Sequence, residues 1–383
     1  MPVEDKKESL AQVTQWIQRA SLACVVSLVP EEAQYTLAQA CIATRTPLVT
    51  ASYVSPRIRE LDQKAKDAGI PLLFECGLDL GIDHMGAMAM IDAIKASGPC
   101  TFRRFSSVCG GLPAPEAADN PIGYKFTWSP SGALRALQRP AQYKGGKIVS
   151  IPGNKLLGHA ADVGVIPALA LEQLPNGNAL PYAELYGMPH VPSIFRGTFR
   201  YRGFSAIMKE CVALGLADDT AISSGTTTWL QLLAHAKTAK KIILSSATED
   251  FFNWLGDASI QGAKTHLQAF GRILEEKLVL QPHERDFVVM VHLIEIERLN
   301  GSTEVHTASL LGYGDKDLTF MSRSVGLAAG IVVQLVLRGD MSRTGILAPT
   351  TPDIYKPALA ALEAEGIVFK ERVTRQPPPL AKL

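Results

Sequence analysis

The chain has 383 residues, of which 47% are hydrophobic and 20% are charged, and its 38 Lys and Arg nearly balance its 37 Asp and Glu. This composition is typical of a globular protein of two or three domains. Because no run of like charge indicates a nucleic-acid arm or a membrane-binding stripe, we expect a protein that binds neither nucleic acid nor a membrane.

The cysteines and the apolar runs bear on whether the protein has a metal site, disulfides or a membrane span. Six cysteines lack CxxC spacing, and most lie in apolar stretches such as LACVVSLV, where a thiol acts as a small hydrophobe. We therefore expect neither a metal site nor a disulfide framework. The segment MPVEDKKESLAQ is unlike a targeting peptide, and runs such as GLAAGIVVQLVL fall short of a membrane span. The expected location is cytoplasmic, or mitochondrial if the chain belongs to a longer precursor.

In the first hundred residues, helical and strand patterns alternate. Helical composition over residues 12–20, 31–44 and 57–68 separates three apolar strands, which we predict at 22–29, 47–53 and 70–77. Apolar strands separated in this way predict a parallel sheet covered by helices on both faces. Ligands of such sheets bind beyond the carboxyl ends of the strands, which here are Pro30, Ser52-Tyr53 and Gly77-Leu78-Asp79.

From Thr101 onward the pattern changes to strands with long irregular connections. Residues 204–280 are mostly helical, two strands meet at Asn300-Gly301, and a long apolar helix ends at Gly339 before a last helix and the strand IVFKERV. We predict an α/β fold in which a partial doubly wound parallel sheet (residues 1–100 and 340–383) is interrupted by an α/β substrate and dimerisation domain. That domain spans residues 101–339 and contains a helical insertion at about 204–283.

Three stretches carry a more specific signal: TASYVSPRIRELDQKAKDAGIPLLFECGLDLGIDHM, SSVCGGLPAPEAADNPIGYKFTWSPSG and RGTFRYRGF. In this order they resemble the saccharopine dehydrogenase (glutamate-forming) family, including the half of the bifunctional enzyme that is fused to lysine-ketoglutarate reductase. The resemblance runs from about residue 22 onward. It implies a Rossmann-like fold and an oxidation of saccharopine, with NAD or NADP, to glutamate and aminoadipate semialdehyde. It also implies a homodimer or a partner that supplies an N-terminal half.

The resemblance also implies roles for particular residues. Tyr53 and Asp79 match catalytic positions, and an Arg fork such as that of Arg200 suits a carboxylate. The implied substrate-binding residues are Ser52, Tyr53, Asp79, Thr198, Phe199 and Arg200, and the implied cofactor-binding residues are Pro30, Ala51 and Asp79.

Several of these residues have a structural alternative. Asp79 would cap a helix that begins near Ile82, and we expect Asp83 to be a cap rather than a catalyst. The role of His84 is open between the site and the scaffold. Because Arg196 and Arg200 alternate along one strand, we expect one of them to point to solvent.

The chain departs from the family at the phosphate-binding loop. No G-x-G-x-x-G loop is present, and no glycine precedes Leu22, so residues 1–21 resemble the end of a missing half. We expect the sheet to have an exposed apolar edge.

A second set of departures lies on the substrate side. Gly177 stands where the family has an arginine, Glu31 and Gln34 replace a tyrosine and a histidine, and Leu80 replaces a proline. A lost bidentate contact is worth roughly 1.5–3 kcal/mol. Two alternatives therefore stay open: a non-catalytic binding or regulatory subunit, and a dehydrogenase acting on another amine or imino acid.

Overall fold

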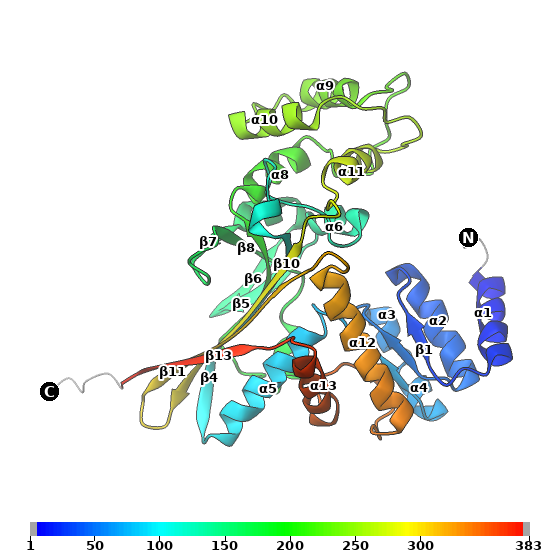
Figure 1. Cartoon of the computed structure of the whole chain (residues 1–383), viewed down its shortest axis with the longest axis vertical. Helices are drawn as coiled ribbons and strands as arrows, with labels where there is room; N and C mark the ends of the chain where they lie inside the picture. Colours follow the sequence, from blue (N-terminus) through cyan, green and yellow to red (C-terminus); the bar gives the residue numbers. More distant parts are fainter. Residues whose placement is uncertain (1–5, 378–383) are drawn as a thin grey trace. The chain divides into compact units, whose positions relative to one another are not determined.

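The computed structural model describes residues 6–377, which divide into two units (Figure 1). The first unit contains the described residues up to Pro99 together with Ser322–Lys370, and the second contains Cys100–Met321 and the described residues from Glu371. The expected second boundary at residue 340 is wrong. It was placed at the glycine that ends a long helix, whereas the chain changes unit near the beginning of that helix.

The first unit is built on a parallel four-stranded sheet in the order β1-β2-β3-β12. The predicted parallel α/β sheet is confirmed, although its strands are shorter than predicted and β12 was not predicted. The strands are β1 (Val25–Ser27), β2 (Leu48–Thr50), β3 (Pro71–Leu73) and β12 (Gly345–Leu347). The helices of this unit, besides most of α12, are α1 (Lys6–Ala20), α2 (Glu31–Thr44), α3 (Pro56–Arg59), α4 (Asp62–Ala68), α5 (Ile82–Ala96) and α13 (Pro352–Ala364). Leu48, Leu72 and Phe74 are fully buried in its core.

Strand β1 forms one edge of this sheet in the part of the chain that the structure describes. Val26 is 51% exposed and Leu28 is 76% exposed, and Val29 beside them is also exposed. An apolar, exposed edge strand was expected from the sequence, and the described residues confirm it.

The second unit contains a mixed nine-stranded sheet in the order β13-β11-β10-β4-β9-β5-β6, with β8 pairing to β9 and β7 to β8. Its strands are β4 (Cys100–Pro113), β5 (Ala141–Gly145), β6 (Lys147–Ile151), β7 (Ala161–Val163), β8 (Leu171–Pro175), β9 (Ser193–Tyr201), β10 (Asp286–Arg298), β11 (Thr303–Tyr313) and β13 (Lys370–Gln376). The predicted hairpin at Asn300-Gly301 is confirmed, because β10 pairs antiparallel to β11 on either side of it. The last strand was expected to close the first sheet. This expectation is wrong, because β13 lies beside β11 in the second sheet.

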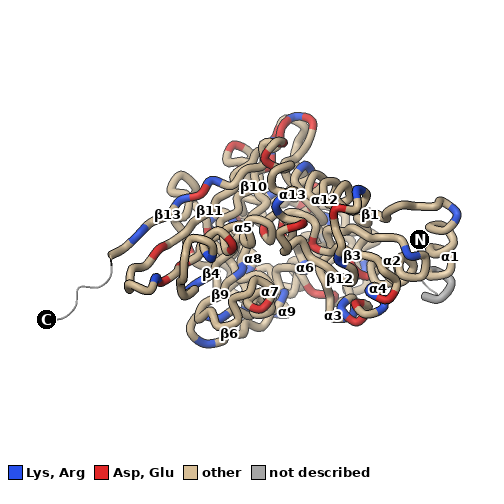
Figure 2. The backbone as a smooth tube through the Cα atoms, turned by 90° about the horizontal axis from the view of Figure 1, so that it is seen from below, with Lys and Arg blue, Asp and Glu red and all other residues tan. Residues whose placement is uncertain are grey.

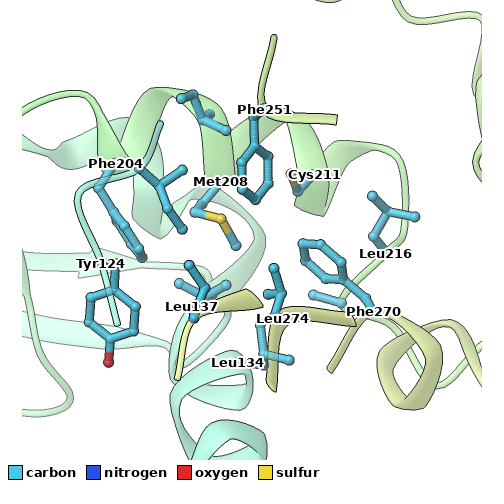
Figure 3. Close-up of a cluster of buried hydrophobic side chains, with 14 of the residues drawn as sticks. Tyr124, Leu134, Leu137, Phe204, Met208, Cys211, Leu216, Phe251, Phe270 and Leu274 are labelled. Carbon is cyan, nitrogen blue, oxygen red and sulfur yellow. The ribbon is translucent and has the colours of Figure 1, made fainter. Parts of the chain in front are cut away.

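The helical insertion shares one hydrophobic core with strands of the second sheet. The helices of this unit are η1 (Pro115–Ala117), α6 (Pro130–Ala136), η2 (Gly153–His159), α7 (Pro181–Leu185), α8 (Phe204–Ala213), α9 (Trp229–Lys240), α10 (Ser246–Leu255) and α11 (His266–Lys277). Phe204, Met208, Phe251 and Phe270 converge in one apolar cluster (Figure 3). The rings of Trp229 and Phe270 stack there with centroids 5.5 Å apart.

Helix α12 (Phe320–Arg338) begins at a buried carboxylate. Asp286 accepts hydrogen bonds from the amides of Phe320 (2.6 Å) and Met321 (2.8 Å), and burial raises the pKa of this carboxyl. Among residues 6–377, α12 alone is long and apolar enough to cross a membrane, with a mean hydropathy of 1.7 and 33% of that window buried. The expectation that every apolar run is too short is therefore wrong for this helix, by length and composition.

Candidate functional site

The predicted strand-end residues of the first unit lie after three neighbouring strands. Pro30 follows β1 at the beginning of α2, Ala51, Ser52 and Tyr53 follow β2, and Asp79 lies between β3 and α5. The structure brings two of them into contact, because the hydroxyl of Tyr53 donates a hydrogen bond to the carbonyl oxygen of Asp79 over 3.2 Å. These two residues were assigned catalytic roles from the resemblance.

The segment that carries Asp79 is a tight turn. The amide of Gly77 donates to the carbonyl of Leu80 (3.0 Å), and the amide of Ile82 donates back to the carbonyl of Gly77 (2.9 Å). Gly81 has a φ of 150°, and a Cβ atom at that position would lie 2.0 Å from the Gly77 carbonyl oxygen. Only glycine fits there, so the second glycine of GLDLG fixes the turn that presents Asp79.

Glu75 and His84 form a buried pair beside this turn. Nε2 of His84 lies 2.9 Å from Oε2 of Glu75, and the two side chains are 0% and 8% exposed. The other carboxylate oxygen of Glu75 accepts from the amide of Val54 (3.0 Å), and the amide of Glu75 donates to the carbonyl of Ser52 (3.0 Å). Glu75 was not predicted from the sequence. The available signal was an acidic residue directly after a buried strand.

Asp83 completes the beginning of α5. Its carboxylate accepts from the amides of Gly81 and His84, both at 2.7 Å, and the residue is fully buried. The N-cap of α5 is Gly81, so Asp83 is not the cap that we expected, although its carboxylate holds backbone amides at the start of the helix. His84 has a scaffold contact with Glu75, and a role of His84 in the site stays a prediction.

A second buried network joins β1, α2 and the end of β2. The side-chain amide of Gln34 donates to the carbonyl of Val29 (2.8 Å) and to the hydroxyl of Ser52 (2.9 Å). Its oxygen accepts from the hydroxyl of Ser27 (3.0 Å). The hydroxyl of Thr50 donates to the carbonyl of Ser27 (2.9 Å), which links the two strands once more. The sequence singled out Gln34 as a departure from the family but gave it no role.

The predicted residues of the second unit lie on β9. Nη1 of Arg200 donates to the hydroxyl of Thr198 (2.9 Å) and to the carbonyl of Phe199 (2.7 Å). The guanidinium lies 5.1 Å from the ring centre of Tyr124. The side chain of Phe199 is fully buried in the core, so only its backbone can contact a ligand.

Arg200 and Tyr124 line a small cavity with Phe126, Leu137, Phe204 and Met208, most of which appear in Figure 3. Nε of Arg200 and the hydroxyl of Tyr124 are buried without a hydrogen-bond partner among the described residues. Buried donors without a partner are unfavourable, and this cavity of about 20 Å³ has room for little more than a water molecule.

Arg196 is also buried, over the ring of Tyr182 at 4.5 Å. The expectation that either Arg196 or Arg200 points to solvent is therefore wrong. Residues four apart on a strand share a face, because the side chains alternate with a period of two.

Gly177, where the family has an arginine, lies between β8 and α7 with a φ of 62°. Its carbonyl accepts from the amide of Gln142 (3.0 Å). The left-handed backbone there favours glycine, so the local turn accommodates the change that removes the guanidinium.

A dinucleotide would need a phosphate cradle, and the described residues of the first unit do not fit one. Helix α2 begins with Glu31 and Glu32, whose negative charges in the first turn disfavour a phosphate at that helix end. The glycines between β3 and α5 pack on one another. The hydroxyls of Ser52 and Tyr53 fit a polar ligand group at the strand ends instead.

Charges of both signs are interspersed along the chain (Figure 2). Within residues 6–377, no three His, Cys, Asp or Glu side chains are grouped to hold a metal ion. The candidate ligand residues are the hydroxyls of Ser52 and Tyr53 with the turn residue Asp79 in the first unit, and, in the second unit, Thr198 and Arg200 on β9.

A parallel sheet whose strands alternate with helices, with polar residues at the strand ends, is an α/β fold of the Rossmann-like type. A sequence model described as the saccharopine dehydrogenase NADP binding domain matches residues 3–73, and one described as the saccharopine dehydrogenase C-terminal domain matches residues 77–367. The chain belongs to the saccharopine dehydrogenase family.

The similar proteins fall into two length classes. The chain is 38% identical to saccharopine dehydrogenase (NADP+, L-glutamate-forming) of Pyricularia oryzae, over 91% of this chain and 84% of that one. It is 36% identical to the mitochondrial alpha-aminoadipic semialdehyde synthase of Mus musculus, of which it spans only 40%. The apo saccharopine dehydrogenase of Saccharomyces cerevisiae is similar in structure, with a TM-score of 0.85, 33% identity and coverage of 97% of this chain and 88% of that chain.

Proposed function

We propose that the chain is an oxidoreductase of lysine metabolism that converts saccharopine to glutamate and aminoadipate semialdehyde with NADP. The names of its relatives and the matched NADP-binding domain support the reaction and favour NADP over NAD. The structural observation that carries the proposal is the contact between Tyr53 and Asp79, which joins two strand-end loops at the position where such sheets bind ligands.

The roles of individual residues belong to the same proposal. Ser52, Tyr53 and Asp79 contact the substrate, and Asp79 pairs a substrate ammonium or assists proton transfer. Arg200 and Thr198 bind a substrate carboxylate through the guanidinium and the hydroxyl, and Phe199 contributes its backbone.

Pro30, Ala51 and Asp79 are assigned to the nicotinamide end of the cofactor. If a nicotinamide were bound, these residues would hold and orient it, and it would supply the hydride acceptor.

The partner and the location are further parts of the proposal. The exposed apolar edge at β1 supports a polypeptide partner, which is either a second copy or a segment supplying an N-terminal half. The expected location is cytoplasmic, or mitochondrial if the chain belongs to a longer precursor.

A steady-state assay with saccharopine and either NADP+ or NAD+ tests the proposal. We expect glutamate formation, faster with NADP+, and a loss of about a hundredfold in kcat for Asp79→Asn. Asp67→Asn is the matched control, because Asp67 bonds Gln63 on an exposed helix surface. No glutamate with either nucleotide, from wild-type protein that is folded, would refute the proposed reaction.

A non-catalytic binding subunit is a second candidate, favoured by Glu31 and Glu32 at the beginning of α2. This candidate predicts folded protein that binds saccharopine but not NADPH. A fluorescence titration with NADPH separates the two functions, since saturable binding excludes the second candidate.

A further inference from the structure

The hydroxyl of Ser52 is held by a side chain that the family resemblance does not assign to the site. Ser52 follows β2, and Gln34 lies on the first turns of α2. Gln34 is only 1% exposed, and its amide nitrogen lies 2.9 Å from the Ser52 hydroxyl oxygen. A buried amide with three partners has one orientation, so it can set the direction of the hydrogen bond.

The orientation of the Gln34 amide follows from its partners. The carbonyl oxygen of Val29 can only accept, so the atom 2.8 Å from it must be the amide nitrogen. One N–H of Gln34 therefore donates to Val29 and the other to Ser52. The amide oxygen accepts from the hydroxyl of Ser27 at 3.0 Å, so every hydrogen-bonding atom of the Gln34 amide is used.

The same reasoning fixes Ser52. Its amide donates to the hydroxyl of Thr50 (3.2 Å), and its carbonyl accepts from the amide of Glu75 (3.0 Å). The hydroxyl oxygen accepts from Gln34, so the hydroxyl hydrogen is the one donor of Ser52 that has no acceptor among the described residues. A half-buried hydroxyl in this state favours a ligand that brings an acceptor.

We propose that Gln34 is a positioning residue that fixes Ser52 as a hydrogen-bond donor to an oxygen atom of the bound ligand. The inference rests on the proposed function only in taking Ser52 as a ligand contact. The oxygen belongs either to a substrate carboxylate or to the nucleotide. An ammonium group cannot accept the hydroxyl hydrogen of Ser52, because it carries only donors.

Substitution of Gln34 and Ser52, alone and together, tests this. Gln34→Glu keeps the shape but removes both N–H donors, so its carboxylate accepts the Ser52 hydrogen instead. We expect the KM for saccharopine or the Kd for NADPH to rise about tenfold, with a smaller change in kcat, which corresponds to a charge-assisted bond. A rise confined to KM assigns the oxygen to the substrate, and a rise confined to the Kd assigns it to the nucleotide.

The double variant shows whether Gln34 acts through Ser52. Ser52→Ala alone should give a similar loss, and Gln34→Glu/Ser52→Ala should be no worse than Ser52→Ala. Additive losses would overturn the inference. Gln39→Glu, on the same helix, is the matched control and should change neither constant. If Gln34→Glu does not fold, Gln34→Met takes its place and should raise the same constant, while unchanged binding in Gln34→Met would overturn the inference.

A readout without ligand separates this inference from the proposed function. In the NMR spectrum of the wild-type chain, both side-chain amide protons of Gln34 should show hydrogen-bonded shifts. Ser52→Ala should move one of them and leave the other. Two unmoved protons would overturn the inference, whereas loss of saccharopine turnover with these shifts intact would count against the proposed function alone.

Discussion

Tyr53 and Asp79 are joined by a hydrogen bond from the phenolic hydroxyl to the backbone carbonyl oxygen, over 3.2 Å. The bond links the loop after β2 to the turn before α5, so that two segments separated by α3, α4 and β3 are held together. Because the carbonyl of Asp79 is the acceptor, the hydroxyl of Tyr53 orients the turn without using the Asp79 carboxylate in this bond.

Tyr53→Phe should therefore loosen the Asp79 turn without unfolding the protein. A hydrogen bond on a partly exposed surface is worth about 0.5–1.5 kcal/mol. We expect kcat/KM for saccharopine to fall by about tenfold, with a small change in the urea midpoint. Tyr35→Phe is the control, because Tyr35 lies under the guanidinium of Arg57 (3.7 Å) elsewhere in the same unit. Equal activity of the two variants would contradict the role of Tyr53.

The Glu75–His84 pair predicts a stability effect. In His84→Leu, Oε2 of Glu75 loses its 2.9 Å partner inside the first unit. A buried acceptor left unpaired costs about 1–3 kcal/mol, whereas the volume-conserving control Met88→Leu on the same helix should cost less than about 1.5 kcal/mol. Urea unfolding measures both. Identical midpoints for the two variants would show that the pair contributes nothing.

The sequence predicted the strands of the first sheet better than it predicted which sheet the last strand joins. Continuous apolar runs identified three strands of the parallel sheet, and turn residues identified the hairpin at Asn300-Gly301. The unit to which β13 belongs did not follow from its sequence. Pairing between distant strands is decided by which edge is open, and not by local propensity.

A residue's role near the candidate site could be predicted only where its position in the local sequence indicates that role. Asp83 is the second residue of the helix that begins at Ile82, so a role at the helix start could be predicted from its position. Glu75 and Gln34 could not be placed, because their roles depend on Val54, Val29 and Ser52, which reach them through the parallel packing of β1, β2 and β3.

Glu304 on β11 predicts a pH dependence of stability. Hydrogen bonds from Arg298, then His306 and Arg375, lower the pKa of this carboxyl from its ordinary value of 4.5 to about 2. Because the folded-state pKa is the lower one, the stabilisation is complete above about pH 4.5 and is lost as the pH falls towards about 2.

Glu304→Gln should lower the free energy of unfolding by about 1 kcal/mol at neutral pH, and the difference from wild type should shrink on acidification. Glu249→Gln, which breaks an exposed pair with Lys237, is the control and should cost less. A difference that stays constant from neutral pH to acid would contradict the assignment to Glu304.

Gly177→Arg tests whether the family chemistry survives the departure at this position. The φ of 62° makes any side chain unfavourable by roughly 1–2 kcal/mol, so both Gly177→Arg and the control Gly177→Ala should be less stable. Only Gly177→Arg adds a guanidinium, and we expect it alone to lower the KM for saccharopine. A lowered KM for saccharopine in Gly177→Ala, or an unchanged KM in both variants, would favour another amine or imino acid as substrate.

The most direct test of the central claim is calorimetric titration of the purified chain with saccharopine, beside Arg200→Met and Arg200→Lys. A saccharopine-binding site predicts saturable binding by the wild type, a loss of about tenfold or more in Arg200→Met and partial retention in Arg200→Lys, which keeps the charge but not the fork. Absence of binding by folded wild-type protein, or equal affinity in all three, would contradict the account.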